Sequence, residues 1–188
     1  MPLPDRATLQ EASAPVSPQT QIPAMAINVV PGTRQKFEQV SELVQALPVN
    51  EAIALLARSF VGSPYLEFSL DGAGPEQLRL DLMRFDCMLF VEQLLAIASA
   101  ESFDQFAERT QRLRYRDGEI GYCTRQHYFH DWVKSAQAQG MLEFNSEWPG
   151  QRTRRVHLNY MSSHRDIYQP LRDQRICSVA SLIASRGE

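Results

Sequence analysis

The residue whose type and setting best suit chemistry is Cys87, which follows an aspartate and opens a strongly apolar segment. Asp86 is a favourable N-cap, because its carboxylate accepts hydrogen bonds from the free N–H groups of a first helical turn. Cys87 would then be the first helical residue, where the helix dipole and the unpaired N–H groups favour a thiolate over a thiol. Because the thiolate is the nucleophilic form of cysteine, this arrangement predicts a reactive residue.

The residues behind Cys87 predict a helix that lies inside its domain. The apolar positions follow a helical period and are Cys87, Phe90, Val91, Leu94, Leu95 and Ala98. Such burial also allows a second interpretation, since free cysteine is among the most buried residue types and usually packs as a small hydrophobe. On the residues alone, Cys87 is either a nucleophile or an inert core residue.

Two amphipathic helices and a strand are predicted ahead of this helix. Apolar positions spaced three and four apart predict a helix over residues 37–47, which Pro48 ends. A second helix is predicted from an Asn50 cap to a Gly-Ser-Pro turn. Leucines alternate with charged residues over residues 77–83, which predicts an extended strand that leads into the cysteine helix.

Two more helices and a hairpin are predicted after the cysteine helix. A serine followed three residues later by a glutamine resembles a capping box and predicts a helix over residues 102–113. Asp117-Gly118 is a strong type I′ turn signal and predicts a hairpin. Residues 127–139 carry a further helical stripe of apolar side chains, which a glycine ends.

Length, composition and charge narrow the function classes. The chain has 188 residues, 44% of them hydrophobic and 22% charged, which is ordinary for one globular domain. The 19 basic and 22 acidic residues leave a net charge of −3, so no nucleic-acid partner is expected. No apolar run approaches the ~20 residues of a membrane span, and no signal peptide is visible. Three widely spaced cysteines argue against a disulfide framework and against a four-cysteine zinc site.

The chain divides into a tail and a domain. Residues 1–32 are rich in proline, serine and glutamine and show no periodicity, so they are predicted to be a flexible tail. Residues 33–188 are predicted to form the domain.

Six short stretches, in this order and at this spacing, resemble one family of proteins. They are FVGSPY (60–65), EQLRLDL (76–82), FDCMLFVE (85–92), RYRDG (114–118), RQHYFHDW (125–132) and MSSHRDIY (161–168). The chain resembles the N-acetylmuramoyl-L-alanine amidase-like branch of the papain-like, NlpC-type cell-wall hydrolases. The resemblance covers about residues 51–175 and none of the tail.

The resemblance implies a fold and an activity. The expected fold is α+β, the helical N-terminal half of a papain-like (NlpC-type) cysteine peptidase fold, mostly α with short strands. The expected activity is hydrolysis of the amide between N-acetylmuramic acid and L-alanine in peptidoglycan or its turnover fragments, with Cys87 as the nucleophile. The expected partners are therefore peptidoglycan or muramyl-peptide fragments in the periplasm or cell envelope, and no cofactor is expected.

Two departures from the family pattern qualify this expectation. Leu89 stands where the family usually has threonine. The family's base histidine lies on a later strand with a His-Val-Gly-like sequence, which is not found here, so the domain is expected to be incomplete at its C-terminus. The alternative function is a catalytically incomplete remnant or binding module of the same family.

The remaining candidates for the site come from the family-like stretches. His127 and His164 could act as the base or line the substrate cleft, whereas His130 and His157 match no family position. A metal on His127 and His130 lacks a defined third ligand, so no metal is predicted.

Carboxylate and sugar contacts are predicted for a second set of residues. Arg116 and Arg125 could bind a substrate carboxylate through bidentate hydrogen bonds, although a solvated basic face is the alternative. Tyr115 is a candidate sugar platform. Asp86 and Tyr128 are further candidates for substrate contact, with a core position as the alternative for Tyr128.

Overall fold

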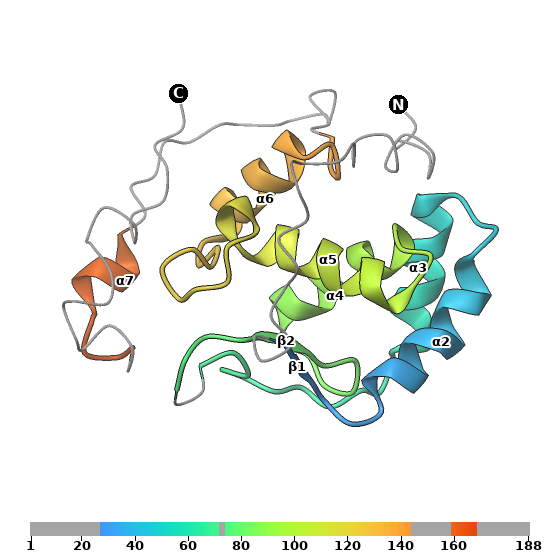
Figure 1. Ribbon diagram of the computed structural model, residues 1–188, viewed down its shortest axis with the longest axis horizontal. Coiled ribbons are helices and arrows are strands. Elements are labelled where there is room, and N and C mark those ends of the chain that lie inside the picture. Colours follow the sequence, from blue (N-terminus) through green and yellow to red (C-terminus); the bar gives the residue numbers. More distant parts are fainter. Residues whose placement is uncertain (1–26, 72–73, 144–158, 169–188) are drawn as a thin grey trace.

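The computed structural model describes residues 27–71, 74–143 and 159–168 (Figure 1). Its elements, in chain order, are β1 (Ile27–Val29), α2 (Thr33–Val44), α3 (Val49–Ser59), β2 (Leu78–Leu80), α4 (Cys87–Ala98), α5 (Phe103–Arg114), the 3₁₀ turn η2 (Arg116–Gly118), α6 (Phe129–Ala138) and α7 (Tyr160–Ser163). The fold is therefore mixed α+β and mostly helical with short strands, which confirms the predicted class.

Helix α4 occupies the centre of the molecule and packs against α2, α3 and α5 (Figure 1). Leu94 and Leu95 are 3% and 4% exposed, so the predicted burial of this helix is correct. Val91 differs, because it lies one turn after Cys87 on the open side of the helix and is 46% exposed. The helix is thus buried along most of its length and opens to solvent where it begins.

Aromatic side chains connect the helices around α4. The ring of Phe37 on α2 stacks on Phe106 of α5, with centroids 5.2 Å apart. Phe60, just after α3, meets the ring of Phe85 edge-on at 5.1 Å, and Phe85 meets Phe90 of α4 at 5.6 Å. Because Phe85 lies two residues before Cys87, this packing fixes the position at which α4 starts.

The two strands form a parallel pair that corrects the predicted extent of the tail. Ile27 pairs with Leu78, and Val29 pairs with Leu80. Residues 27–29 are therefore a strand, although they fall within the predicted 1–32 tail. Composition led to the tail prediction, whereas the partner strand lies about 50 residues away in sequence and gives no local signal. Residues 1–26 lie outside the described residues.

A threonine secures this pair to the segment that leads to Cys87. The hydroxyl of Thr33 donates to the carbonyl oxygen of Leu80 at 3.4 Å and accepts from the backbone N–H of Leu82 at 3.2 Å. Gly32, just before it, has φ 87°, a left-handed conformation that glycine adopts without a Cβ penalty. The turn between β1 and α2 therefore depends on this glycine.

The sequence predicted one helix start correctly and two others wrongly. Ser102 caps α5 by accepting from the backbone N–H of Gln105 at 3.2 Å, as the capping-box pattern indicated. Helix α3 begins after Pro48 rather than at an Asn50 cap, and α6 begins at Phe129, two residues later than predicted. Proline is well suited to a helix start, because it needs no N–H partner there.

The Asp-Gly turn forms, but the chain pairs across a longer loop than the predicted hairpin. Asp117 and Gly118 have φ of 55° and 69°, as a type I′ turn requires. The paired backbone lies further out, where Arg116 N–H donates to the carbonyl of Thr124 at 2.8 Å. This pairing brings the 124–126 segment against the end of α5.

Candidate active site

Cys87 is an exposed free thiol at the first residue of α4. Asp86 adopts an extended backbone, and its Oδ1 accepts from the backbone N–H of Leu89 at 2.8 Å. The predicted N-cap and the predicted first helical position of Cys87 are therefore both confirmed. The exposure removes the alternative of an inert core cysteine.

The first turn of α4 retains donors beside the sulfur. Helices leave their first four N–H groups without intrahelical partners. Asp86 takes the N–H of Leu89 through its side chain and that of Phe90 through its carbonyl, at 3.0 Å. Among the described residues, no backbone partner takes the N–H groups of Cys87 and Met88. These two donors therefore lie in the same first helical turn as the thiol of Cys87.

Tyr65 is a neighbour of Cys87 that the sequence analysis did not select. Residues 64–66 pair with Phe85, whose carbonyl accepts from Leu66 N–H at 3.0 Å. This pairing brings the Tyr65 side chain near Cys87, close enough for Cys87 to act on the pKa of the tyrosine hydroxyl. Its pKa is raised, first by desolvation and then by the negative charges of Cys87 and Asp86, so the hydroxyl stays protonated at neutral pH.

The signal for Tyr65 was weak in the sequence. It closes the FVGSPY stretch, so the resemblance already included it. What places it against the thiol is a pairing between segments 20 residues apart, which no local pattern predicts. We call Tyr65, Asp86 and Cys87 the cysteine rim.

Behind the cysteine rim, Asp81 holds the segment that leads into α4. Asp81 is 1% exposed, and its Oδ1 accepts from the backbone N–H groups of Met83 and Arg84 at 3.0 and 3.2 Å. Its Oδ2 is bound by Arg79 at 3.1 Å and by Arg84 at 3.2 Å. The side-chain amide of Gln93 on α4 donates to the Asp81 carbonyl at 3.1 Å. The approach to Cys87 is thereby fixed by both backbone and side-chain contacts.

His127 lies against Tyr122, not against Cys87. Its Nε2 is 2.7 Å from the carbonyl oxygen of Tyr122, and the two rings are 4.7 Å apart. Because a carbonyl can only accept, Nε2 carries the proton. Burial, followed by the positive charge of Arg125, lowers the pKa of His127 to about 4. The ring is therefore neutral at pH 7 and part of the packing around Tyr122.

The other histidines are also separate from the cysteine rim among the described residues. His164 is exposed, stacks on Tyr160 at 4.2 Å and places Nδ1 3.0 Å from the Tyr160 carbonyl. His130 is exposed on α6, and His157 lies outside the described residues. None of the described histidines is brought to Cys87.

Arg125 is buried at 7% exposure, and groups of the same chain bind its guanidinium. Its guanidinium donates to the carbonyl of Leu70 at 2.9 Å and to Asp71 at 2.5 Å. It also pairs with Glu76 at 3.4 Å and lies 4.7 Å from the ring centre of Tyr122. The predicted bidentate site for a substrate carboxylate is thus occupied by internal carboxylates.

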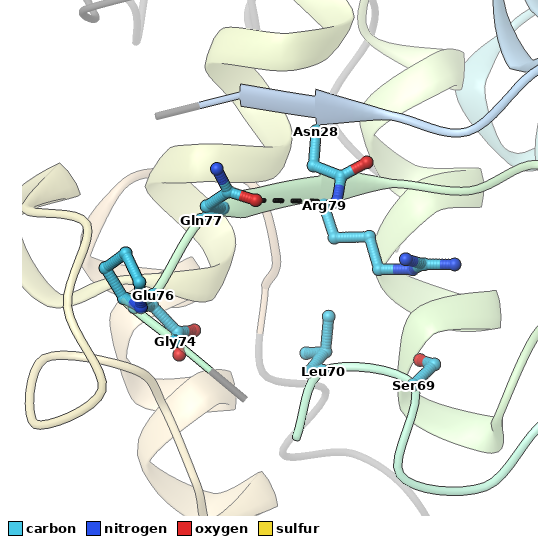
Figure 2. Close-up of a pocket in the computed structure, with 8 residues that line it drawn as sticks. Asn28, Ser69, Leu70, Gly74, Glu76, Gln77 and Arg79 are labelled. Atoms are coloured by element: carbon cyan, nitrogen blue, oxygen red, sulfur yellow. Dashed lines mark hydrogen bonds between the residues drawn. The ribbon is translucent and has the colours of Figure 1, made fainter. Parts of the chain in front are cut away.

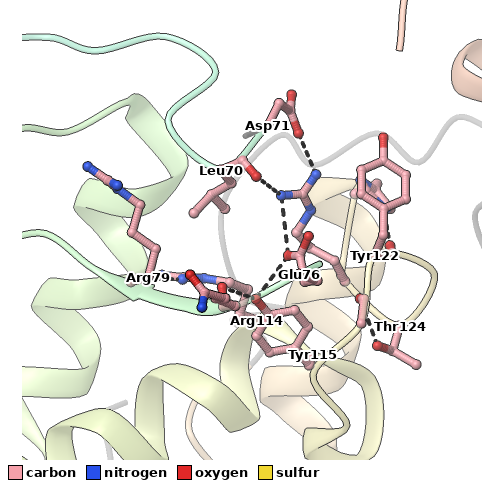
Figure 3. A network of polar contacts seen from close by, with 12 residues as sticks. Leu70, Asp71, Glu76, Arg79, Arg114, Tyr115, Tyr122 and Thr124 are labelled. Carbon is pink, nitrogen blue, oxygen red and sulfur yellow. Dashed lines mark hydrogen bonds and ion pairs between the residues drawn. The ribbon is translucent and has the colours of Figure 1, made fainter. Parts of the chain in front are cut away.

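Tyr115 cannot serve as a sugar platform in this structure. It is 0% exposed, and its hydroxyl donates toward Glu76 at 3.0 Å and the carbonyl of Gln77 at 3.1 Å (Figure 3). Its pKa is raised, chiefly by burial. The prediction failed because a tyrosine in a hairpin pattern can face either side, and this one faces the core.

The neighbouring Arg114 makes the most buried ion pair described. Arg114 and Glu92 are 2% and 3% exposed, with 2.6 Å between Arg114 Nη2 and Glu92 Oε1. Its Nη1 donates to the carbonyl of Arg79 in β2 at 2.6 Å. The pair therefore ties α4, α5 and β2 together. We call Arg114, Glu92, Arg125, Glu76 and Tyr115 the buried network.

Arg116 and Tyr128 remain nearer the surface. Arg116 is exposed and donates to the carbonyl of Cys123 at 2.9 Å. Tyr128 is half-buried, and its hydroxyl accepts from the backbone N–H of Met161 at 3.1 Å. Of these two, Arg116 keeps a solvent-facing guanidinium, so it stays a candidate for substrate contact.

Cys123 is joined in a disulfide, in contrast to the free thiol of Cys87. The count and spacing of the cysteines had argued against a disulfide framework. The bridge at Cys123 was therefore not predicted, because the spacing of cysteines along the sequence does not report their proximity in space. In the described part of the chain, no group of three acidic, histidine or cysteine side chains could hold a metal. No helix described is both long and apolar enough to cross a bilayer.

Comparison with known proteins points to one family. Residues 55–178 match the N-acetylmuramoyl-L-alanine amidase-like family. Two structures of an N-acetylmuramoyl-L-alanine amidase from Bacteroides uniformis ATCC 8492 are 30% and 29% identical, both with a TM-score of 0.64, over 73% and 74% of this chain. A proposed xylanase from Bacteroides fragilis is 36% identical over 63% of this chain, with a TM-score of 0.59. No curated protein matches.

The chain spans only part of the length of these relatives. It covers 62% and 64% of the two Bacteroides uniformis structures and 54% of the Bacteroides fragilis structure.

Proposed function

This chain belongs to the N-acetylmuramoyl-L-alanine amidase-like family, and we propose that it acts as a cysteine-dependent amidase on peptidoglycan or its turnover fragments. The observation that carries the proposal is the exposed free thiol of Cys87 at the start of α4, beside Tyr65 and two backbone N–H donors. A nucleophile at the start of a buried helix is the plan of papain-like enzymes, which the sequence resemblance implies.

The proposed bond is the amide between the lactyl group of N-acetylmuramic acid and L-alanine. The thiolate of Cys87 attacks the carbonyl carbon, and its oxygen becomes an oxyanion that the N–H groups of Cys87 and Met88 stabilise. The C–N bond then breaks, and the amine of L-alanine leaves with the proton that the base took from the thiol. Water hydrolyses the thioester, which releases the lactyl carboxylate and restores the thiol.

The base of this reaction is proposed to lie outside the described residues. His127 contacts Tyr122 and His164 contacts Tyr160, so neither is placed to take the proton of Cys87. Both histidines are proposed to act in packing rather than in proton transfer. Tyr65 is proposed to orient the sulfur, and exposed Arg116 to meet an acidic group of the substrate.

The distance of the described histidines from Cys87 favours one alternative function. Because no described histidine reaches Cys87, the chain could bind muramyl peptides without cleaving them, as a binding module of the family. The two functions differ in turnover but not in binding.

The proposed location is the periplasm or cell envelope, where peptidoglycan is found. The disulfide at Cys123 supports it, since such bonds persist mainly in oxidising compartments.

The test is hydrolysis of N-acetylmuramoyl-L-alanyl-D-isoglutamine, with release of N-acetylmuramic acid followed by chromatography. We expect Cys87→Ala to lose at least about 10³-fold in rate, because the covalent step disappears. Val91→Ala is the matched control, one turn further along the same exposed edge of α4, and should keep its rate. Activity that survives in Cys87→Ala would disprove the cysteine mechanism. Binding of the substrate by the wild type without turnover would instead establish the binding module.

A further inference from the structure

Phe68 combines two features that the stability of the fold does not explain. Its backbone has φ 54°, in the left-handed region that side chains larger than glycine rarely adopt. Its side chain is also 70% exposed, so the ring gains little from burial. Residues held in strained backbone conformations cluster at active sites and ligand clamps. Phe68 is therefore a candidate for contact with a ligand.

The other described residues with a positive φ show what is usual at such positions. Five of them are glycines, which have no Cβ to clash, and the remaining one is Asp117. Aspartate tolerates the left-handed conformation because its short polar side chain can hydrogen-bond locally. Within the described part of the chain, only Phe68 places a bulky apolar side chain at a positive φ.

The turn that carries Phe68 is held at both ends. Before it, the N–H of Leu66 donates to the carbonyl of Phe85 at 3.0 Å. After it, Arg125 binds the Asp71 carboxylate at 2.5 Å, and the Asp71 N–H donates to the carbonyl of Phe68 at 3.0 Å. Strained conformations persist where the surrounding structure over-determines them, and these contacts do so here. The backbone that carries the ring is therefore fixed.

The inner side of this turn consists of the two residues that follow Phe68. Ser69 and Leu70 line a pocket together with Asn28 and Arg79 of the strand pair (Figure 2). Both are half-buried, whereas Phe68 is exposed. The turn thus faces the strands through Ser69 and Leu70 and presents the side chain of Phe68 to solvent.

The turn begins beside the cysteine rim. Leu66 pairs with Phe85, which lies two residues before Cys87. Because an extended chain advances at most about 3.6 Å per residue, the Cα of Phe68 lies within about 7 Å of the Cα of Leu66. Tyr65, which belongs to the cysteine rim, is 64% exposed. Two exposed aromatic side chains therefore lie on the segment that passes the thiol.

We infer that the ring of Phe68 stacks on the sugar ring of a muramyl peptide, an inference that rests on the proposed function for its class of ligand. A phenyl ring has no hydrogen-bonding group, so it favours the apolar C–H face of a sugar over the carboxylate-bearing peptide. The sugar is joined through its lactyl group to the carbonyl that Cys87 is proposed to attack. A sugar contact close to the thiol is therefore consistent with that reaction.

The test measures binding by isothermal titration calorimetry to the full chain carrying Cys87→Ala, in which the proposed nucleophile is absent. The ligands are N-acetylmuramic acid and N-acetylmuramoyl-L-alanyl-D-isoglutamine. Adding Phe68→Gly should weaken the binding of both ligands about fivefold, because the stacked ring is lost. Phe68→Tyr keeps an aromatic ring and should stay within about twofold. Phe129→Ala is the matched control, since Phe129 is 60% exposed but stacks on Trp132 of α6, and its affinities should also stay within about twofold.

The unfolding midpoint separates a ligand contact from a structural role. Phe68→Gly should unfold at the same or a higher temperature than its parent, because glycine relieves the left-handed strain and little burial is lost. A lower midpoint would overturn the inference, since the ring would then stabilise the fold. It is equally overturned if only the peptide-bearing ligand loses affinity, if Phe68→Gly binds both ligands as its parent does, or if neither ligand binds the parent. Because no measurement here depends on turnover, failure of the amidase mechanism in the hydrolysis assay is distinguishable from failure of the sugar contact.

Discussion

The cysteine rim and the buried network both contain residue types that serve catalysis and binding, but they differ in how their polar groups are used. In the cysteine rim, the thiol of Cys87 is exposed and Tyr65 is 64% exposed. In the buried network, Arg114 and Arg125 are 2% and 7% exposed, and carboxylates of the same chain bind both. The two regions therefore differ in whether a reactive side chain is exposed and has an atom free to react. They do not differ in the types of residue that they contain.

This comparison explains the roles that we assign to the arginines. A guanidinium whose donors are already bound to carboxylates cannot also bind a substrate carboxylate without losing those bonds. Arg125 binds Leu70, Asp71 and Glu76, so it fixes the positions of these three residues. The buried network thus has a structural role: it holds other residues in position and does not itself bind the substrate.

Among the variants that distinguish the two regions, Arg114→Met is expected to lower the free energy of unfolding most. Breaking a buried ion pair leaves Glu92 uncompensated, which costs about 3–5 kcal/mol of the free energy of unfolding. Urea denaturation measures this loss. Arg116→Met, on the exposed neighbour, should stay within about 0.5 kcal/mol. A cost near 1 kcal/mol for Arg114→Met would mean that the pair is not a structural centre.

His127 gives the next largest effect, through pH. Its pKa is lowered to about 4 in the folded protein from 6.5, so the unfolded chain binds the proton more tightly. This contribution is fully present above pH 6.5 and is lost as the pH falls to 4. The expected loss is about 3 kcal/mol, since one pKa unit corresponds to about 1.4 kcal/mol.

Unfolding midpoints measured between pH 7 and pH 4 test this expectation in two variants. His127→Gln should flatten the dependence, because its amide can still donate to Tyr122 but does not take up a proton. His130→Gln, at an exposed position on α6, should retain the wild-type slope. An unchanged slope in His127→Gln would assign the pH dependence to other groups.

The same contrast shows what the sequence could predict. The start of α4, its Asp86 cap and the burial of Leu94 depend on neighbours within one or two turns, so local patterns found them. The β1 strand and the contact between Tyr65 and Cys87 depend on segments distant in sequence. These pairings follow from tertiary packing, which periodicity does not encode.

Burial of polar residues was the other limit of the sequence analysis. Tyr115 lies in a turn-rich stretch whose pattern does not say which side faces the core. Arg125 was assigned to a solvent-facing or a substrate-binding role, yet it is enclosed with its own carboxylate partners. Such pairs form only after folding brings Asp71 and Glu76 to it, so the local sequence contains no signal of them.

Within the cysteine rim, loss of the cap should have a smaller effect than loss of a buried ion pair. Asp86→Ala removes the acceptor for the Leu89 N–H and should cost about 1 kcal/mol of unfolding free energy. Asp86→Asn keeps an acceptor oxygen and should remain within about 0.5 kcal/mol of the wild type. Equal losses in both variants would show that the charge, rather than the hydrogen bond, stabilises the start of α4.

The smallest effect on the fold, and the most direct probe of the cysteine rim, is expected in Tyr65→Phe. Because Tyr65 is largely solvent-exposed, its hydroxyl should not alter the unfolding midpoint. The hydroxyl lies near the sulfur of Cys87 and is the polar group of Tyr65 that could orient it, so its loss should slow iodoacetamide alkylation of Cys87 about two- to threefold at neutral pH. Mass spectrometry assigns the modified residue.

A control variant shows whether the slower alkylation is specific to the contact between Tyr65 and Cys87. Tyr160→Phe is the matched control, since that tyrosine is also exposed but stacks on His164 away from Cys87, and its alkylation rate should equal that of the wild type. An equal slowing in both variants would mean that the rate reports overall loosening rather than the contact between Tyr65 and Cys87. A selective slowing in Tyr65→Phe would show that an exposed side chain acts on the nucleophile while adding nothing to stability, which is the opposite of what Arg114 does in the buried network.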